Sequence, residues 1–166
     1  MTVVYERSFD WNEWFVILLI FSLNGLIIKT PNIFTKMEGI AHYLYGMTIV
    51  FFFDHTLSTR PWDYYDVNDN SNFQLFDFLY YTMNGPFSYY FIYLYQKLNI
   101  DGFRTIPYLF IWSGFAVLTE WVGLKMGLFH YDKGYKMYWS FPIYMIVQII
   151  QIIFYHKIRR SMDHHN

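Results

Sequence analysis

The 166-residue chain contains no cysteine, and only 15% of its residues are charged. Without cysteine it forms no disulfide, zinc–thiolate site or iron–sulfur cluster, and it has no thiol nucleophile. Its net charge of −1 argues against a general nucleic-acid binder. The sequence also has no Walker loop, dinucleotide fingerprint, His-Glu-x-x-His or Gly-x-Ser-x-Gly motif. We therefore expect no cofactor and no nucleic-acid partner.

Apolar residues are abundant, at 55% of the chain against about 45–50% in ordinary soluble domains. Aromatic residues reach 25%, and the charges cluster, which leaves long uncharged stretches. Tyr and Trp side chains are typical of the headgroup level of a bilayer. Residues 1–13 carry one arginine against three acids, unlike a signal peptide, so the first apolar segment is expected to remain as a span. These features predict an integral membrane protein with the lipid bilayer as a partner.

Five apolar segments approach or exceed the length of about 20 residues that a membrane-spanning helix needs. They predict an all-α fold, a transmembrane helical bundle of five spans that forms a single domain over residues 1–166. The predicted helices cover residues 11–28, 36–56, 72–97, 103–126 and 140–160.

Local signals mark the helix boundaries. Thr35 and Glu38 have the spacing of a capping box at the start of the second helix, as do Ser71 and Gln74 at the third. Ser140 is expected to cap the fifth helix. Within the third helix, the sequence Asn84-Gly85-Pro86 predicts a kink, because proline lacks a backbone donor. Gly123 and Gly127 match a Gly-x-x-x-Gly motif, which marks either the end of the fourth helix or a dimer seam.

The loops between the spans differ in charge. Five Lys and Arg residues fall on the side of the N-terminus and seven on the other side. This majority favours an outside N-terminus and a cytoplasmic C-terminus. Ten acids against three predict an acidic outer face. Together with a composition typical of an AT-rich bacterial genome, these counts predict a multi-pass protein of the bacterial plasma membrane.

Polar residues recur at helical spacing within the spans, where they are costly and usually face the bundle or water. Three stripes follow from steps of three and four residues. They are Ser113, Ala116, Glu120, Gly123 and Gly127 on the fourth helix; Gln74, Asp77, Tyr81, Asn84 and Ser88 on the third; and Tyr144, Gln148, Gln151 and Tyr155 on the fifth.

The depths of these stripes predict an acidic pocket that opens outward. Its candidate residues are Asp54, His55, Asp77, Asn84, Ser113, Glu120, His130, Asp132 and Gln148. A structural interpretation competes with a functional one, because polar side chains inside a bundle also pair with one another and set the helix register.

The loop before the third helix offers oxygen ligands with partial calcium-loop spacing, at Asp66, Asn68, Asn70 and Asp77. Ser71 stands where a calcium loop needs glycine, and Asp77 is shorter than the bidentate glutamate of the last position. A polar loop that leads into a capped helix explains the same residues, and we predict no metal site.

The last third of the chain contains the segments Thr119–Lys125, Gly127–Tyr131 and Tyr138–Ser140. They resemble the C-terminal signature of a family of small, uncharacterised multi-pass membrane proteins from Bacillus- and Clostridium-type bacteria. The resemblance implies a membrane protein and no particular activity. A glutamate followed by spaced glycines and a tyrosine-containing loop is also similar to integral-membrane carotenoid hydratases and cyclases. That motif departs from theirs at many positions, and no activity is carried over.

Three functions remain open at this point. The first is a non-enzymatic bundle that binds a membrane-protein partner, a lipid or a small cation at its acidic face. The second is an intramembrane enzyme that acts on a lipid or isoprenoid, with Glu120 as acid or base and Asp77 or His55 assisting. The third is a small transporter that uses the polar seam. A tunnel from the bilayer to Glu120 would favour the enzyme, and a continuous wet seam would favour transport.

Overall fold

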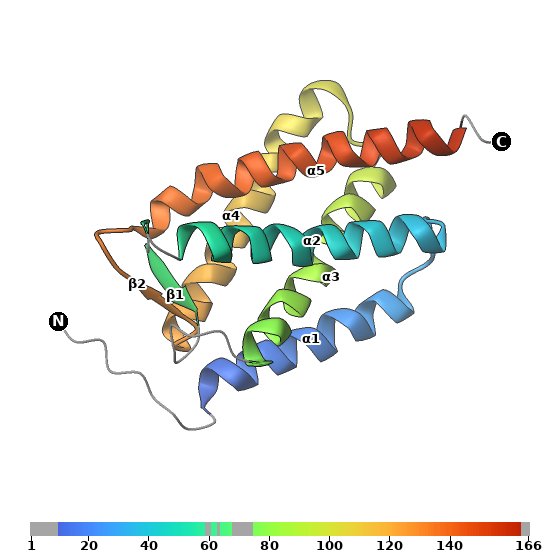
Figure 1. Ribbon diagram of the computed structural model, residues 1–166. Coiled ribbons are helices and arrows are strands. Elements are labelled where there is room, and N and C mark those ends of the chain that lie inside the picture. The colour runs from blue at the N-terminus through green and yellow to red at the C-terminus, as the bar shows by residue number, and fades with distance from the viewer. Residues whose placement is uncertain (1–9, 59–60, 63, 68–74, 164–166) are drawn as a thin grey trace.

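The computed structural model describes residues 10–58, 61–62, 64–67 and 75–163, apart from the side chains of Asp66, Leu75 and Asp163. Five α-helices make up most of this part of the chain (Figure 1). They are α1 Trp11–Lys29, α2 Lys36–Leu57, α3 Leu75–Lys97, α4 Thr105–Lys125 and α5 Ser140–Asp163. The shorter elements are the 3-10 helices η1 Gly102–Arg104 and η2 Met137–Trp139 and the strands β1 Tyr65–Val67 and β2 Phe129–Tyr131.

The five predicted helices are confirmed as helices, with ends that agree to within a few residues. Thr35 and Glu38 form the predicted capping box: the Thr35 amide donates to Glu38 Oε2 at 2.7 Å and the Glu38 amide donates to Thr35 Oγ1 at 3.2 Å. The second predicted capping box, Ser71 with Gln74, lies outside the described residues. Gly127 lies at the end of α4, as the helix-end interpretation of the Gly-x-x-x-Gly motif predicts. It has a φ of +81°, and the Leu128 amide donates to the Gly123 carbonyl.

Three of the described helices are long and apolar enough to cross a membrane: α1, α4 together with η1, and α5 together with η2. Large apolar side chains on the outer faces of all five helices are exposed, for example Leu18, Phe52, Phe78, Phe110 and Ile150. Soluble monomers rarely expose apolar surface on this scale. Ten polar or charged residues are buried instead, a distribution typical of a protein whose outside contacts lipid.

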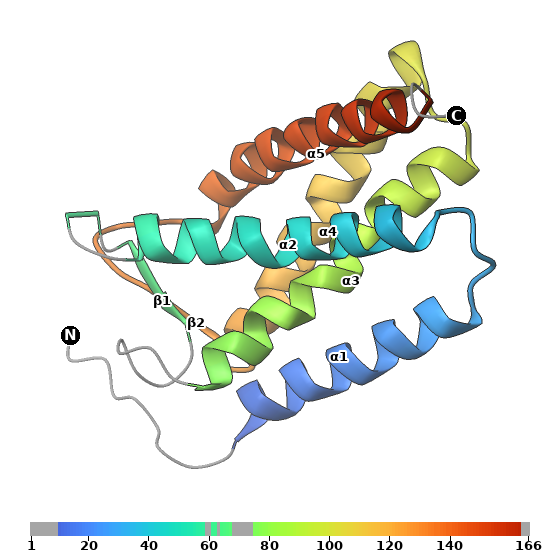
Figure 2. The same cartoon turned by 45° about the vertical axis from the view of Figure 1, so that its right-hand side comes forward.

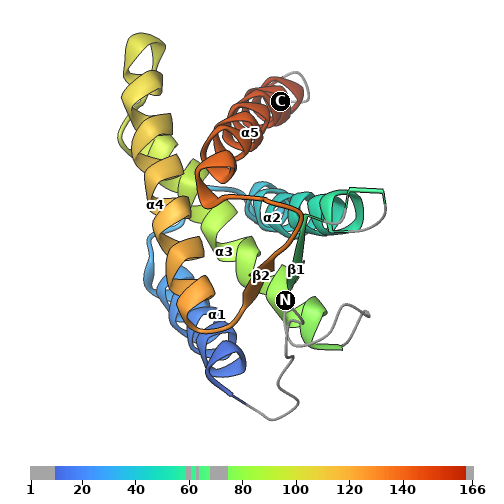
Figure 3. The same cartoon turned by 90° about the vertical axis from the view of Figure 1, so that its left-hand side faces the viewer.

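Consecutive helices run in opposite directions, and the two strands sit at one end of the bundle (Figures 1 and 2). We name this end the strand end and the opposite one the far end. α1, α3 and α5 begin at the strand end, whereas α2 and α4 begin at the far end. Viewed from the strand end, the other helices are arranged around α3 (Figure 3). α2 and α1 pack against α3, and α4 packs against α5.

α2 and α3 approach closely because each contributes a glycine to their crossing. A Cβ at Gly46 would lie 2.4 Å from the carbonyl oxygen of Asn84, and at Gly85 the Tyr43 ring occupies the space of a side chain. The Tyr43 hydroxyl donates to the Thr82 carbonyl at 3.4 Å. This is the carbonyl that an amide at position 86 would bond in a regular helix, and Pro86 has none. α3 continues through Pro86 as one helix.

Candidate functional site

At the strand end, β1 and β2 form a short antiparallel pair of strands, in segments where the sequence predicts loops. Tyr65 pairs with Tyr131 and Val67 with Phe129. Val67 is buried in a cluster with Tyr80 and Leu128. The alternation of aromatic residues around His130 was the available signal, but three residues are too few for periodicity to identify a strand. The pairing brings the side chains of Tyr65 and Tyr131 to the strand end of the bundle.

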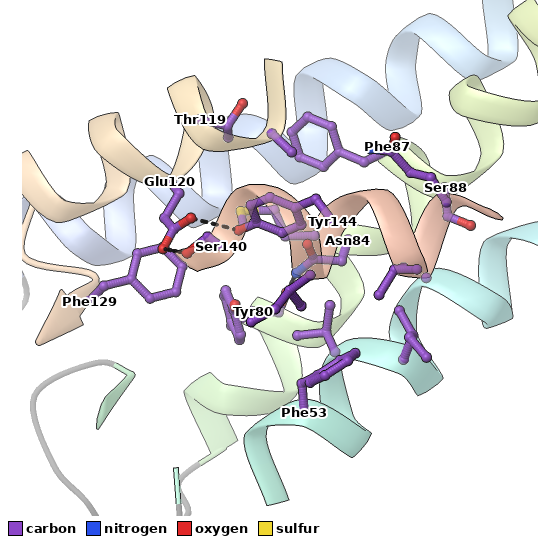
Figure 4. A pocket seen from close by; sticks show the side chains of 18 of the residues that line it. Phe53, Tyr80, Asn84, Phe87, Ser88, Thr119, Glu120, Phe129, Ser140 and Tyr144 are labelled. Carbon is purple, nitrogen blue, oxygen red and sulfur yellow. Dashed lines mark hydrogen bonds between the residues drawn. The ribbon is translucent and has the colours of Figure 1, made fainter. Parts of the chain in front are cut away.

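Glu120 lies on α4 beneath this strand pair and is only 6% exposed. Its carboxylate accepts hydrogen bonds from three hydroxyl groups, and Figure 4 shows the bonds from Ser140 and Tyr144. Tyr131 of β2 is one donor; Ser140 and Tyr144 of α5 donate at 2.7 and 3.0 Å. Tyr135 extends the network, with its hydroxyl 2.9 Å from Ser140 Oγ. We call these five residues the Glu120 cluster.

Ser140 differs from its predicted role. It is the first residue of α5, after the 3-10 helix η2, and its hydroxyl donates to Glu120 instead of capping the helix backbone. The predicted stripe on α4 does face inward, because Ser113, Glu120 and Gly123 are all buried. Gly123 allows the Phe129 ring to pack against α4, since a Cβ there would lie 2.9 Å from that ring.

The tyrosines outside the helices remain protonated donors at neutral pH. Burial raises the pKa of Tyr131, and its hydrogen bond to Glu120 raises it further. Burial also raises the pKa of Tyr135 and of Tyr65, and the negative charges of Asp54 and Glu120 add to the effect on Tyr65. A hydroxyl that keeps its proton can donate to a carboxylate, and such a hydrogen bond is stronger than one between two neutral groups.

A cavity of about 200 Å³ extends from the Glu120 cluster toward the middle of the bundle. Most of its wall is aromatic or aliphatic, and residues of all five helices contribute to it. The polar groups along it, apart from the Glu120 cluster, are Tyr65, Tyr80, Asn84, Ser88, Thr119, Gln148 and Gln151, with Tyr45 also in the wall. Figure 4 shows Asn84 and Ser88 of α3 on the side of the cavity away from Glu120.

Two amides inside the cavity are each only partly satisfied by the protein. Asn84 donates through Nδ2 to the Tyr80 carbonyl at 2.8 Å, so its oxygen is the group available to a ligand. Gln148 accepts from Ser113 at 3.1 Å, and its Nε2 group has no hydrogen-bond partner among the described residues. The cavity therefore presents both an acceptor and a donor at mid-depth.

The cavity wall includes a side chain that is also exposed on the outside of the bundle. Phe115 of α4 lines it and is 45% exposed, and the Phe115 ring lies 6.1 Å from that of Phe87 on α3. Thr119, one turn along α4, belongs to the same part of the wall (Figure 4). An opening between α3 and α4 would face the hydrocarbon of a bilayer rather than water.

The candidate residues of the acidic pocket predicted from the sequence are divided in the structure. Of its nine candidate residues, only Asn84, Glu120 and Gln148 line the cavity. Ser113 lies behind Gln148 as its donor. The remaining candidates occupy other positions around the strand end: Asp54, His55, Asp77, His130 and Asp132.

Asp54 does not line the cavity, although its charge and that of Glu120 both act on Tyr65 of β1. Asp54 accepts from the hydroxyls of Tyr81 at 2.5 Å and Ser58 at 3.2 Å. Asp77 is buried in the first turn of α3, outside the cavity wall.

The other candidates lie further out. His55 is exposed, and its Nδ1 is 3.0 Å from the Phe51 carbonyl. His130 is the middle residue of β2, and Asp132 is exposed and accepts from the Lys133 amide at 2.7 Å. The cavity instead includes Tyr131, Tyr135, Ser140 and Tyr144, of which only Tyr144 belonged to a predicted stripe.

The described residues contain no group of three or more His, Asp or Glu side chains that could hold a metal ion. Asn68, Asn70 and the side chain of Asp66 lie outside the described part of the chain, so the calcium spacing stays untested. Comparisons with protein-family models, curated proteins and solved structures find no match. The resemblance to small bacterial membrane proteins stays a prediction, and function has to be inferred from the geometry of the site.

Proposed function

We propose that the protein crosses the membrane five times, with an outside N-terminus and a cytoplasmic C-terminus in a bacterial plasma membrane. α2 and α3 are the two helices to be added to the three apolar ones. Their mean hydropathy is lowered by side chains that lie inside the bundle, such as Glu38, His42 and Asp77. Their outward residues are apolar, including Phe52 and Phe78. Only the outward face meets lipid, and polar groups within a membrane span usually face the bundle interior, as these do.

We further propose that the protein binds one end of an amphiphilic membrane molecule in its cavity. The observation that supports this function is a cavity that begins at an exposed apolar wall and ends at the Glu120 cluster. A dry cavity of about 150 Å³ is enough for benzene. A volume of about 200 Å³ therefore accepts a ring or a short branched chain end, while the rest of the molecule stays in the bilayer.

The chemistry of the cavity defines that end. A carboxylate has about four acceptor positions, of which three are used by the hydroxyls of Tyr131, Ser140 and Tyr144. One acceptor position is left at Glu120, and the Asn84 oxygen is a second acceptor deeper in the cavity. A ligand that donates a hydrogen bond, such as the hydroxyl of a lipid alcohol, satisfies these groups. A second anion would be repelled by Glu120.

The test is to purify the protein from its membrane in a mild detergent and to identify bound lipids by native mass spectrometry. Ala116→Phe places a ring in the cavity wall, and Leu118→Phe places the same ring on the exposed side of the same helix. We expect a bound lipid in the wild type and in Leu118→Phe, and its loss in Ala116→Phe. Equal lipid content in both variants, or none in the wild type, would overturn the proposal.

An intramembrane enzyme is the second candidate, because the cavity places the Glu120 carboxyl against whatever occupies it. A carboxyl can pass a proton to or from a bound lipid. The Glu120→Gln variant separates the two functions when the extracted lipids are compared with those of the wild type. An enzyme would leave a chemically altered lipid in the wild type and an unaltered one in Glu120→Gln. A binding protein would hold the same molecule in both.

A further inference from the structure

The far end of the bundle contains a second polar cluster, away from the cavity. His42 of α2 is 0% exposed, and neither of its ring nitrogens has a hydrogen-bond partner among the described residues. The Tyr93 hydroxyl of α3 is buried and equally lacks a partner in the described part of the chain. A buried polar group without a partner costs about 1–3 kcal/mol. These three atoms belong to two side chains that both lie against the Phe34 ring, and together they indicate that a group outside the chain completes the site.

Two charged residues flank His42. Glu38 precedes it by one helical turn and is 1% exposed. Its Oε1 lies 2.7 Å from Nε of Arg159 on α5, but the Arg159 N–H is not directed at this oxygen in a hydrogen bond. Arg159 donates instead through Nη2 to Gln96 Oε1 at 2.7 Å. The carboxylate and the guanidinium balance each other, so the pair favours neither a cation nor an anion as the missing group.

Residues of α5 and of the connection between α1 and α2 pack around His42. Glu38 and Arg159 are the charged groups that act on its ring, and Tyr155 of α5 lies with its ring 5.8 Å away. Phe34, from the connection between α1 and α2, covers the ring at 5.4 Å and also contacts Tyr93. The Arg159 side chain is 37% exposed, so the cluster extends to the surface of the far end.

We propose that Glu38, His42, Tyr93 and Arg159 form a hydrated protonation site that is reached from the far end. Water is neutral, needs only about 10–15 Å³, and bonds two to four polar partners. The ring nitrogens of His42, Oε1 of Glu38 and the Tyr93 hydroxyl supply them. The imidazole takes a proton from hydronium on its free nitrogen, leaving water, and returns the proton to water in the reverse step.

The site is connected to the cavity wall by hydrogen bonds. Ser88 of α3 donates through its hydroxyl to the His42 carbonyl at 2.5 Å. Gln151 of α5 donates through Nε2 to the Ser88 hydroxyl at 2.6 Å and to its carbonyl at 2.8 Å. Ser88 and Gln151 both line the cavity. The backbone of His42 is therefore joined to two side chains of the cavity wall. None of the four residues of the proposed protonation site lines the cavity, so this proposal does not depend on a ligand bound there.

Nuclear magnetic resonance of the full chain in detergent, with ¹⁵N-labelled histidine, tests the proposal. The His42 signal is assigned by its loss in His42→Phe, which replaces one buried ring by another. We expect this signal to exchange magnetisation with water and to shift as the pH is varied from about 4 to 9, which brackets the ordinary histidine pKa of about 6.5. A signal without water contact and without pH dependence would overturn the proposal.

Two further variants keep the test decisive if His42→Phe does not fold. Phe34→Ala removes the cover and should accelerate water exchange at one histidine only. Glu38→Gln should change the pH dependence of that signal, whereas Glu13→Gln should not. Glu13 is a matched control because it occupies the same capping-box position at the start of α1. If Phe34→Ala leaves all exchange rates unchanged, or if both glutamine variants act alike, the assignment of the site is contradicted.

Discussion

Replacing Gly46 by alanine should separate α2 from α3 and lower stability. The added Cβ would lie 2.4 Å from the Asn84 carbonyl oxygen and 2.6 Å from Ser88 Cβ. A backbone oxygen cannot rotate away, so the two helices must move apart. Such overpacking costs about 1–3 kcal/mol. The matched control is Gly114→Ala on α4, where nothing lies within 4 Å of the added atom.

Alanine is a better helix former than glycine by about 1 kcal/mol, and this gain is common to both variants. The difference between them is therefore the overpacking cost alone. For a protein of this size each kcal/mol shifts the melting temperature by about 2–4 °C. Thermal unfolding in one detergent should place Gly46→Ala below Gly114→Ala by about 2–12 °C. Equal melting temperatures would refute the close approach of α2 and α3, and with it the position of the cavity wall.

Three other predictions concern the site and its supports. Glu120→Ala leaves one buried and two half-buried hydroxyls without their acceptor and should lower thermal stability by about 1–3 kcal/mol or more, while Glu120→Gln keeps one acceptor oxygen and should cost less; equal melting curves for the two variants would contradict this. Tyr43→Phe removes the donor from the Thr82 carbonyl and should cost about 1 kcal/mol, whereas Tyr138→Phe on the exposed surface should cost almost nothing. Because the pKa of Tyr131 is raised on folding, its contribution to stability is complete below its ordinary pKa of about 10 and is lost as the pH rises toward the folded value. The melting temperature should therefore fall above about pH 10, less steeply in Tyr131→Phe, and an unchanged slope would count against the buried bond to Glu120.

The helices of this protein could be predicted from the sequence because their signals are local. Apolar length identifies each helix, the spacing of Thr35 and Glu38 identifies a helix start, and Gly127 identifies a helix end. The inward direction of the polar stripes could also be predicted, because side chains three and four residues apart share a helix face. Glu120 and Gln148 accordingly lie inside the bundle.

The composition of the site could not be predicted, because it depends on contacts between distant segments. Tyr65 meets Tyr131 through a strand pair too short to have a sequence signal of its own. The sequence predicts the role of Glu38 in its capping box. Its ion pair with Arg159 joins segments far apart in the chain and has no sequence signal of its own. The spacing of Glu38 and His42 by one helical turn was the available signal for the far-end cluster.

The proposed topology places all five helices, including α2 and α3, in the lipid bilayer with their apolar faces outward. The absence of cysteine allows single-cysteine variants to carry a spin label without background. Labels at Phe52, Phe78 and Ile150 in lipid nanodiscs should collide mainly with oxygen, which dissolves in hydrocarbon. A label at Asp132 in the strand-end loop should collide mainly with a water-soluble nickel chelate. If the chelate reaches Phe52 and Phe78 as readily as Asp132, these two helices are in water and the account is contradicted.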